Sequence, residues 1–188
     1  MAEFQMEYSA ESAAQPEEIW ERYTDVDEWR EWSKGIEESS LEGDFEVGSK
    51  GTAKAPNLPK GRFELIEVEP KRRFVSKAKW PGGRLILDHM IEPTNGGTRI
   101  THRATIAGPL DFLWSPVVGR IIKRELPGSV ERLAELAVEK EEEARKEAQE
   151  KEKRDARLEK ADEEFKAEIK RTSKGEEDQG GASLPGAV

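Results

Sequence analysis

The first residues alternate between apolar and polar positions, which is typical of a half-buried strand over residues 4–10. The segment Gln15-Pro16-Glu17-Glu18 then predicts the start of a helix, because proline suits the first helical position and acidic side chains suit its positive end. A second short helix is predicted for residues 26–32. It places Trp29 and Trp32 three residues apart, on one face.

After Gly35 the pattern changes to strands and turns. Six further strands are predicted, at residues 36–41, 49–55, 62–68, 72–80, 84–91 and 98–106. Short links join most of them, so neighbouring strands should pair antiparallel.

A long helix is predicted to follow the last strand. It should begin near Ser115-Pro116, and Pro127-Gly128 should kink or restart it. Apolar positions then recur at helical spacing along one stripe, made by Leu126, Val130, Leu133 and Ala137.

This order of elements predicts an α+β fold. One helix cannot cover both faces of seven strands, so the economical arrangement is a seven-stranded antiparallel sheet curved around the long C-terminal helix. The two short helices would close one end, and the concave side would hold either a packed core or a cavity.

The two histidines of the chain are predicted to lie side by side. If residues 94–97 form the loop between the last two strands, Ile91 pairs with Ile100 and His89 lies opposite His102 on the concave face. Three interpretations are open. The pair is a hydrogen-bonded part of the interior, a polar anchor for a ligand with acid–base catalysis as a special case, or a metal site. No third inward ligand is evident, so no metal is expected.

Large and small side chains divide the predicted concave face. Small residues there (Gly51, Ala53, Ala55, Ser76, Ala78 and Ala104) would form the floor of a pocket. The side chains predicted to line it and contact a ligand are Trp29, Trp32, Phe63, Phe74, Trp80, Leu87, His89, His102 and Trp114. The alternative is that the aromatic side chains fill this space themselves.

Composition excludes several classes of protein. The chain has no cysteine, which removes disulfides, thiolate metal sites and cysteine nucleophiles. A net charge of −9 argues against a nucleic-acid partner, and the basic strip at residues 71–79 is interpreted as a turn and the wet face of a strand. Neither a secretory signal nor a membrane-spanning run is evident, so a cytoplasmic protein without integral membrane contact is expected.

The charged residues concentrate at the C-terminal end. Residues 139–188 hold 12 Lys or Arg and 16 Asp or Glu among 50 positions, too many to form a core of their own. We expect a folded domain at residues 1–140, a charged, solvent-exposed helical extension at 141–171 and a disordered tail at 172–188. Leu158, Ala161, Phe165 and Ile169 form a thin apolar stripe on that extension, which a protein partner could use.

Residues 4–138 resemble the SRPBCC proteins of the START-like superfamily, the polyketide cyclase/dehydrase and lipid-transport family. The similarity lies in residues 15–20, in the D-x-x-x-W-x-x-W segment of residues 25–32, and in residues 45–49, 67–74 and 96–110. The resemblance implies a helix-grip fold with a hydrophobic cavity. It transfers no catalytic residue, and the proline usual after the second tryptophan is absent here, where Ser33-Lys34 follows Trp32.

The preferred hypothesis is a binding or carrier protein for a small hydrophobic molecule, aromatic or lipid-like, without a cofactor. The first alternative is a cyclase- or dehydratase-like enzyme that uses His89 and His102 as acid–base or polarising groups. The second is an interaction scaffold that acts through its charged helical tail.

Overall fold

The structure, a computed structural model, describes residues 4–56 and 58–177. The chain divides into two compact units, one ending at Glu142 and the other beginning at Glu143. The first unit contains the whole sheet and the short helices.

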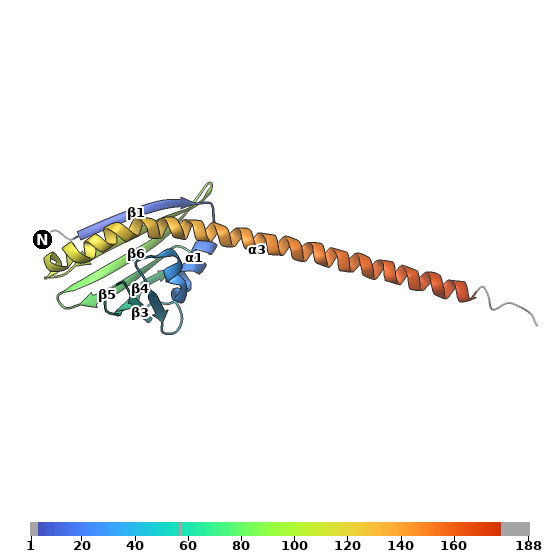
Figure 1. The fold of residues 1–188 in the computed structure, drawn as a ribbon, viewed down its shortest axis with the longest axis horizontal. Helices are drawn as coiled ribbons and strands as arrows, with labels where there is room; N and C mark the ends of the chain where they lie inside the picture. The colour runs from blue at the N-terminus through green and yellow to red at the C-terminus, as the bar shows by residue number, and fades with distance from the viewer. Residues whose placement is uncertain (1–3, 57, 178–188) are drawn as a thin grey trace, which may run out of the picture. The chain divides into compact units, whose positions relative to one another are not determined.

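Seven antiparallel strands form one sheet in the order β1-β7-β6-β5-β4-β3-β2, as Figure 1 shows in part. The strands are β1 (Phe4–Ser12), β2 (Glu38–Leu41), β3 (Lys50–Lys54), β4 (Gly61–Glu69), β5 (Arg73–Trp80), β6 (Gly83–Thr94) and β7 (Gly97–Ala107). The predicted seven-stranded antiparallel sheet is confirmed. Because β1 pairs with β7, the first strand of the chain lies at one edge, beside the last.

Two short helical segments follow β1, as predicted. Helix α1 (Pro16–Thr24) begins at a proline followed by Glu17 and Glu18, and it buries Ile19 and Tyr23. The second segment is a 3₁₀ turn, η1 (Val26–Glu28), that runs directly into the single turn α2 (Trp29–Trp32). Both tryptophans of α2 are buried, because they lie on the face of the turn that packs on the sheet.

The pairing of β6 with β7 has the predicted register. Ile91 lies opposite Ile100, and His89 lies opposite His102. The connection itself is a two-residue turn, since Thr94 still pairs with Gly97. A shorter loop with the same register leaves every side chain on its predicted face.

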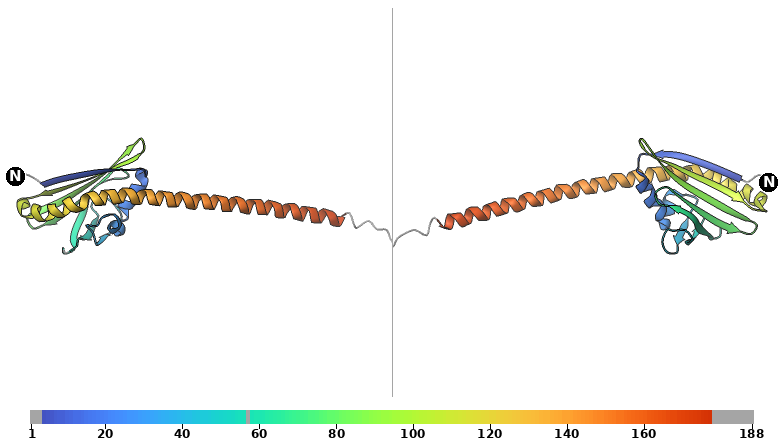
Figure 2. Two further views of the ribbon diagram at one scale, coloured as in Figure 1. Left: turned by 45° about the horizontal axis from the view of Figure 1, so that its top comes forward. Right: turned by 180° about the vertical axis from the view of Figure 1, so that it is seen from behind.

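The long helix α3 (Asp111–Glu177) packs its first part on one face of the sheet (Figures 1 and 2). Val130, Leu133 and Ala137 are fully buried there, together with Ile19 and Tyr23 of α1. The predicted stripe is therefore the surface that the helix buries.

The predicted start of this helix is wrong, because it begins at Asp111, before the expected Ser115-Pro116. Of the two outcomes predicted at Pro127-Gly128, a kink or a restart, the restart does not occur, because the helix continues through Pro127. Proline removes one backbone hydrogen bond from a helix. Burial of Leu126 and Val130 on either side of Pro127 holds the two halves in one helix.

The second unit consists, in its described part, of the helical residues 143–177. Its surface is charged, with ion pairs such as that of Lys166 with Asp162, and it exposes Leu158 and Phe165. Of the segment predicted to be disordered, residues 172–177 continue α3 and residues 178–188 lie outside the described part. None of the described helices is long and apolar enough to cross a membrane.

Candidate functional site

Three elements of the fold bring Tyr23, His89 and His102 together in the interior. Strands β6 and β7 place the two imidazoles as cross-strand neighbours, with ring centroids 4.4 Å apart. Helix α1 adds Tyr23, whose phenolic oxygen lies 2.8 Å from Nε2 of His102 in a buried hydrogen bond. All three side chains are buried. We call these residues the polar cluster.

Burial sets the charge state of the polar cluster. It lowers the pKa of His89 to about 3, against the weaker opposing effect of backbone groups at Phe74 and Leu87. Burial also lowers the pKa of His102 well below its usual value, and the nearby His89 adds to this effect. The pKa of Tyr23 is raised well above 10 by the same loss of water. The whole cluster is therefore neutral at pH 7.

Aromatic rings surround the polar cluster on the concave face. Phe74 stacks on His89 at 4.0 Å, and Trp32 meets His102 edge-on at 5.7 Å. Trp29 stacks on Phe63 at 5.4 Å and on Phe74 at 6.0 Å. The structure thus brings together six of the nine residues predicted to contact a ligand: Trp29, Trp32, Phe63, Phe74, His89 and His102.

These aromatic side chains pack on one another and on the small residues of the floor. At Gly51, for example, a Cβ atom would lie 2.4 Å from the ring of Phe63. The part of the concave face around the polar cluster is accordingly a packed aromatic core.

The remaining predicted residues lie elsewhere. Trp80 and Leu87 are only half-buried and belong to a second apolar cluster, which includes Ile106 and Leu126. The side chain of Trp114 lies outside the described part of the structure. The predicted set therefore spans two regions of the concave face instead of one.

Two buried nitrogens, on rings that both contact His102, have no hydrogen-bond partner within the described residues. They are Nδ1 of His89 and Nε1 of Trp32. By contrast, Nε1 of the neighbouring Trp29 donates to the carbonyl oxygen of Tyr23 at 3.0 Å. Buried polar atoms are nearly always hydrogen-bonded, so two exceptions on rings that contact the same imidazole need an explanation.

Within the described part of the chain, no carboxylate forms a hydrogen bond or ion pair with the imidazoles of the polar cluster. Asp88 precedes His89 in β6, but its side chain points to the opposite face, where Arg73 binds it at 2.8 Å. Arg103 lies 3.7 Å from the same carboxylate. In the described part of the chain, no group of three or more His, Asp or Glu side chains is placed to hold a metal ion. The cluster therefore offers neutral donors and acceptors.

Tyr23 is the functional candidate that sequence reasoning missed. Its place beside Ile19 on the apolar side of the predicted helix suggested packing alone. A tyrosine at a fully buried position was nevertheless a signal, because its hydroxyl group must find a partner inside the protein.

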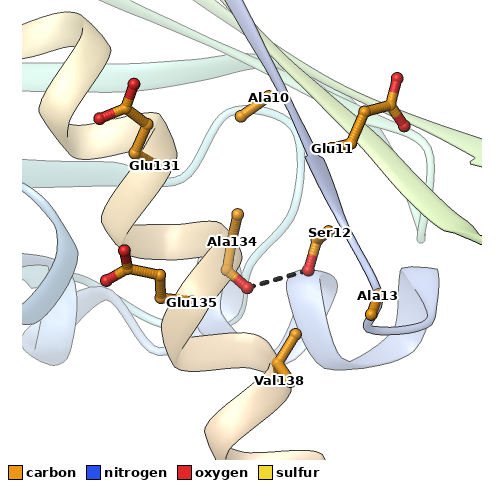
Figure 3. Close-up of a pocket in the computed structure, with 8 residues that line it drawn as sticks. All are labelled: Ala10, Glu11, Ser12, Ala13, Glu131, Ala134, Glu135 and Val138. Atoms are coloured by element: carbon orange, nitrogen blue, oxygen red, sulfur yellow. Dashed lines mark hydrogen bonds between the residues drawn. The ribbon is translucent and has the colours of Figure 1, made fainter.

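A separate open groove of about 460 Å³ lies between the end of β1 and α3 (Figure 3). The groove stays open because its lining includes small side chains from both elements, such as Ala10 and Ala134. The hydroxyl group of Ser12 donates to the carbonyl oxygen of Ala134 at 2.9 Å. The carboxylates of Glu11, Glu131 and Glu135 lie at its rim (Figure 3). Nothing in the hydrophobic pattern of the sequence singled out this groove.

A curved antiparallel sheet that grips one long helix, with a neutral polar cluster inside it, defines a helix-grip protein. Residues 3–138 match the model of one such family, polyketide cyclase / dehydrase and lipid transport, and the chain belongs to this family. Membership supports a ligand-binding or cyclase-type role.

Solved structures share the fold at low sequence identity. A protein from Nitrosomonas europaea is 17% identical, with a TM-score of 0.58 over 72% of this chain and 95% of that one. Norcoclaurine synthase from Thalictrum flavum, solved with dopamine and hydroxybenzaldehyde, is 16% identical, with a TM-score of 0.57 over 73% and 88%. The protein Ara h 8.0201 is 14% identical, with a TM-score of 0.59 over 73% and 99%. A search of curated protein sequences finds no match.

Proposed function

We propose that the protein binds one small hydrophobic molecule, aromatic or lipid-like, between the concave face of the sheet and α3. The observation that carries this proposal is the pair of unpartnered buried nitrogens, Nδ1 of His89 and Nε1 of Trp32. A buried polar atom without a partner costs about 1–3 kcal/mol. One polar group on a ligand, such as a hydroxyl or carbonyl, would relieve that cost once the aromatic rings packed around the polar cluster move to admit it.

The neutral state of the polar cluster favours an uncharged polar group on the ligand. Neither histidine carries a charge at pH 7, because burial lowers the pKa of both. A charged headgroup would have to be desolvated without an ionic partner, which is strongly unfavourable.

The half-buried part of the concave face supports a hydrophobic body for the ligand. Leu87 precedes His89 by two residues on the same face of β6, about 7 Å away along the strand. Leu87, Leu85 and Trp80 are apolar and face inward, yet all three remain partly exposed. Apolar surface next to a neutral polar cluster suits an amphiphilic or aromatic molecule.

A matched pair of substitutions in β6 tests this proposal. Leu87 and Ile86 are adjacent and both half-buried, but they face opposite sides of the sheet. We expect an uncharged hydrophobic fluorescent probe such as N-phenyl-1-naphthylamine to bind saturably, and Leu87→Gln to weaken its binding about tenfold. Ile86→Gln should leave probe affinity unchanged. Non-saturable binding, or equal effects of the two substitutions, would argue against an internal site.

A cyclase- or dehydratase-like reaction is the alternative, in which the neutral imidazoles of His89 and His102 polarise the substrate through hydrogen bonds. A pKa of about 3 makes His89 a weak base at pH 7, so this polarising role is favoured over proton abstraction. If the protein is an enzyme, His89→Gln should leave binding of a substrate nearly intact and reduce turnover by on the order of 10²–10⁴. In a carrier, the same change should only weaken binding.

The cytoplasmic location expected from the sequence is part of the proposal.

A further inference from the structure

Four large apolar side chains are exposed at the start of α3 and just before it. Leu110, Phe112, Leu113 and Val117 have exposed fractions of 39%, 61%, 56% and 57%. Single exposed apolar residues are ordinary, but four within eight positions form a contiguous patch that marks an interaction surface. We call these four residues the apolar tip.

The apolar tip is held against the sheet. The backbone N–H of Leu110 donates to the carbonyl oxygen of Gly82 in the β5–β6 turn, at 2.9 Å. The side chain of Leu110 covers Gly82 so closely that a Cβ atom there would lie 2.4 Å from it. Gly82 also has a φ of 73°, which favours glycine. The exposure of the tip is therefore a property of the folded domain.

Basic side chains lie behind the tip, at the same end of the domain. Lys79 and Arg84 are exposed and directly opposite each other, one pair away from the β5–β6 turn. Arg120 and Lys123 follow the tip along α3, and Nζ of Lys123 lies 5.6 Å from the centre of the Phe4 ring. None of these four cations has a carboxylate within 4 Å among the described residues.

This arrangement is costly for the protein alone. Like charges directly opposite on neighbouring strands destabilise a sheet, and the apolar tip exposes hydrophobic surface to water. The chain as a whole carries a charge of −9, so an end with four cations that have no carboxylate within 4 Å among the described residues stands out from the rest of its surface. An anionic partner with an apolar layer would compensate both costs.

We propose that this end of the domain docks on the surface of an anionic lipid bilayer. The apolar tip enters the boundary between headgroups and acyl chains, and Lys79, Arg84, Arg120 and Lys123 lie among the anionic headgroups. This is how amphipathic surface elements with aromatic and leucine side chains on one side and cations beside them bind membranes.

Docking would turn the half-buried part of the concave face toward the bilayer. Leu85 pairs with Ile106, one position from the pair of Arg84 with Ala107, so this surface lies at the same end as the tip. A lipid-like ligand could then pass between bilayer and protein. This consequence rests on the proposed function, whereas docking itself does not.

Vesicle flotation of the full chain tests the proposal. Two kinds of vesicle are compared, phosphatidylcholine alone and phosphatidylcholine with phosphatidylglycerol in equal parts. We expect binding to the anionic vesicles, weakened by salt, and much less to the neutral ones. Phe112→Ser with Leu113→Ser should weaken binding at least about tenfold, because inserted apolar side chains are lost. Arg120→Gln with Lys123→Gln should weaken it on the order of twentyfold.

The second unit provides matched controls for both pairs. Phe165 and Leu158 are each 62% exposed, close to the values of Phe112 and Leu113, so Phe165→Ser with Leu158→Ser removes similar exposed surface. Arg145→Gln with Lys153→Gln removes the same charge. These variants should bind anionic vesicles as the unaltered chain does, and thermal melts should verify that every variant is folded.

Two results would overturn the proposal: absence of binding to anionic vesicles, and equal loss of binding in the tip and control variants. If absence of binding comes with self-association that Phe112→Ser with Leu113→Ser abolishes, the tip is instead an interface between copies of this chain. A failed probe titration with intact vesicle binding would overturn the ligand site alone.

Discussion

Tyr23 and His102, 79 residues apart in the chain, share a hydrogen bond of 2.8 Å in the interior. It joins helix α1 to strand β7 and holds His102 against His89. Because water does not reach this bond, removing either partner leaves the other unsatisfied. The predictions below follow from this neutral, buried arrangement.

Loss of the hydroxyl group of Tyr23 should destabilise the protein. Tyr23→Phe leaves Nε2 of His102 buried without its partner, which should cost about 1–3 kcal/mol in the free energy of unfolding. Tyr8→Phe is the control, because the hydroxyl group of Tyr8 binds Glu131 in an exposed position and should matter little. Urea unfolding of the two variants measures the difference. If both variants lost the same free energy of unfolding, the buried hydrogen bond would contribute no more to stability than the exposed one.

Stability should fall as the solution becomes acidic, starting below the unfolded histidine pKa of about 6.5. The folded-state pKa of His89 is about 3 and that of His102 is also lowered, so the unfolded chain binds more protons between these values. The contribution of the two neutral histidines to the free energy of unfolding is constant above pH 6.5 and is lost progressively below it. At pH 5.5 each histidine should lower the free energy of unfolding by about 1.4 kcal/mol relative to its value at neutral pH.

The variant His102→Gln isolates this effect from the titration of carboxylates. It should show about half of the loss between pH 7.5 and 5.5 in urea unfolding, because one of the two buried imidazoles remains. NMR titration gives an independent reading. Imidazole resonances that titrate near pH 6.5 would contradict burial of the pair.

The two tryptophans of α2 should respond differently to substitution. Trp29→Phe breaks the hydrogen bond from Nε1 to the carbonyl oxygen of Tyr23, whereas Trp32→Phe removes a nitrogen that has no partner among the described residues. Both changes reduce volume similarly, so Trp29→Phe should cost about 1 kcal/mol more in thermal or urea unfolding. The opposite order would mean that Nε1 of Trp32 already has a strong partner, such as buried water.

Removal of the second unit should hardly affect the domain. A chain ending at Glu142 keeps the buried stripe, and its unfolding free energy should change by about 1 kcal/mol or less. Leu133→Ala, within the stripe, should cost roughly 2–5 kcal/mol because it leaves a cavity in the core. Calorimetry of both variants makes the comparison. A large loss on truncation would show that residues beyond 142 stabilise the domain.

The pattern of the sequence was enough to predict the sheet and the pairing of His89 with His102. Alternation determines which side chains share a face, and a short turn between two long strands determines the register. The helical stripe that includes Val130 and Leu133 was likewise evident from its spacing. These features depend on local rules, so they could be derived without coordinates.

The division of the concave face into two regions could not be derived in this way. Phe74 and Trp80 share a face of β5, yet the first is fully buried and the second half-exposed. Their exposure differs because α1 and α2 cover only part of the sheet. Which part they cover depends on tertiary packing, and the alternation of apolar and polar residues does not encode it. The hydrogen bond of Tyr23 depends on the same packing.

The central claim, that the concave face holds a small hydrophobic molecule with one polar group, is tested most directly by native mass spectrometry of gently purified protein. We expect part of the protein to carry one co-purified small molecule, and Leu87→Gln to reduce that fraction while Ile86→Gln does not. Chemical identification should find an apolar body with a single uncharged polar group. Protein that carries no molecule, and that takes up no hydrophobic compound when one is added, would contradict the account.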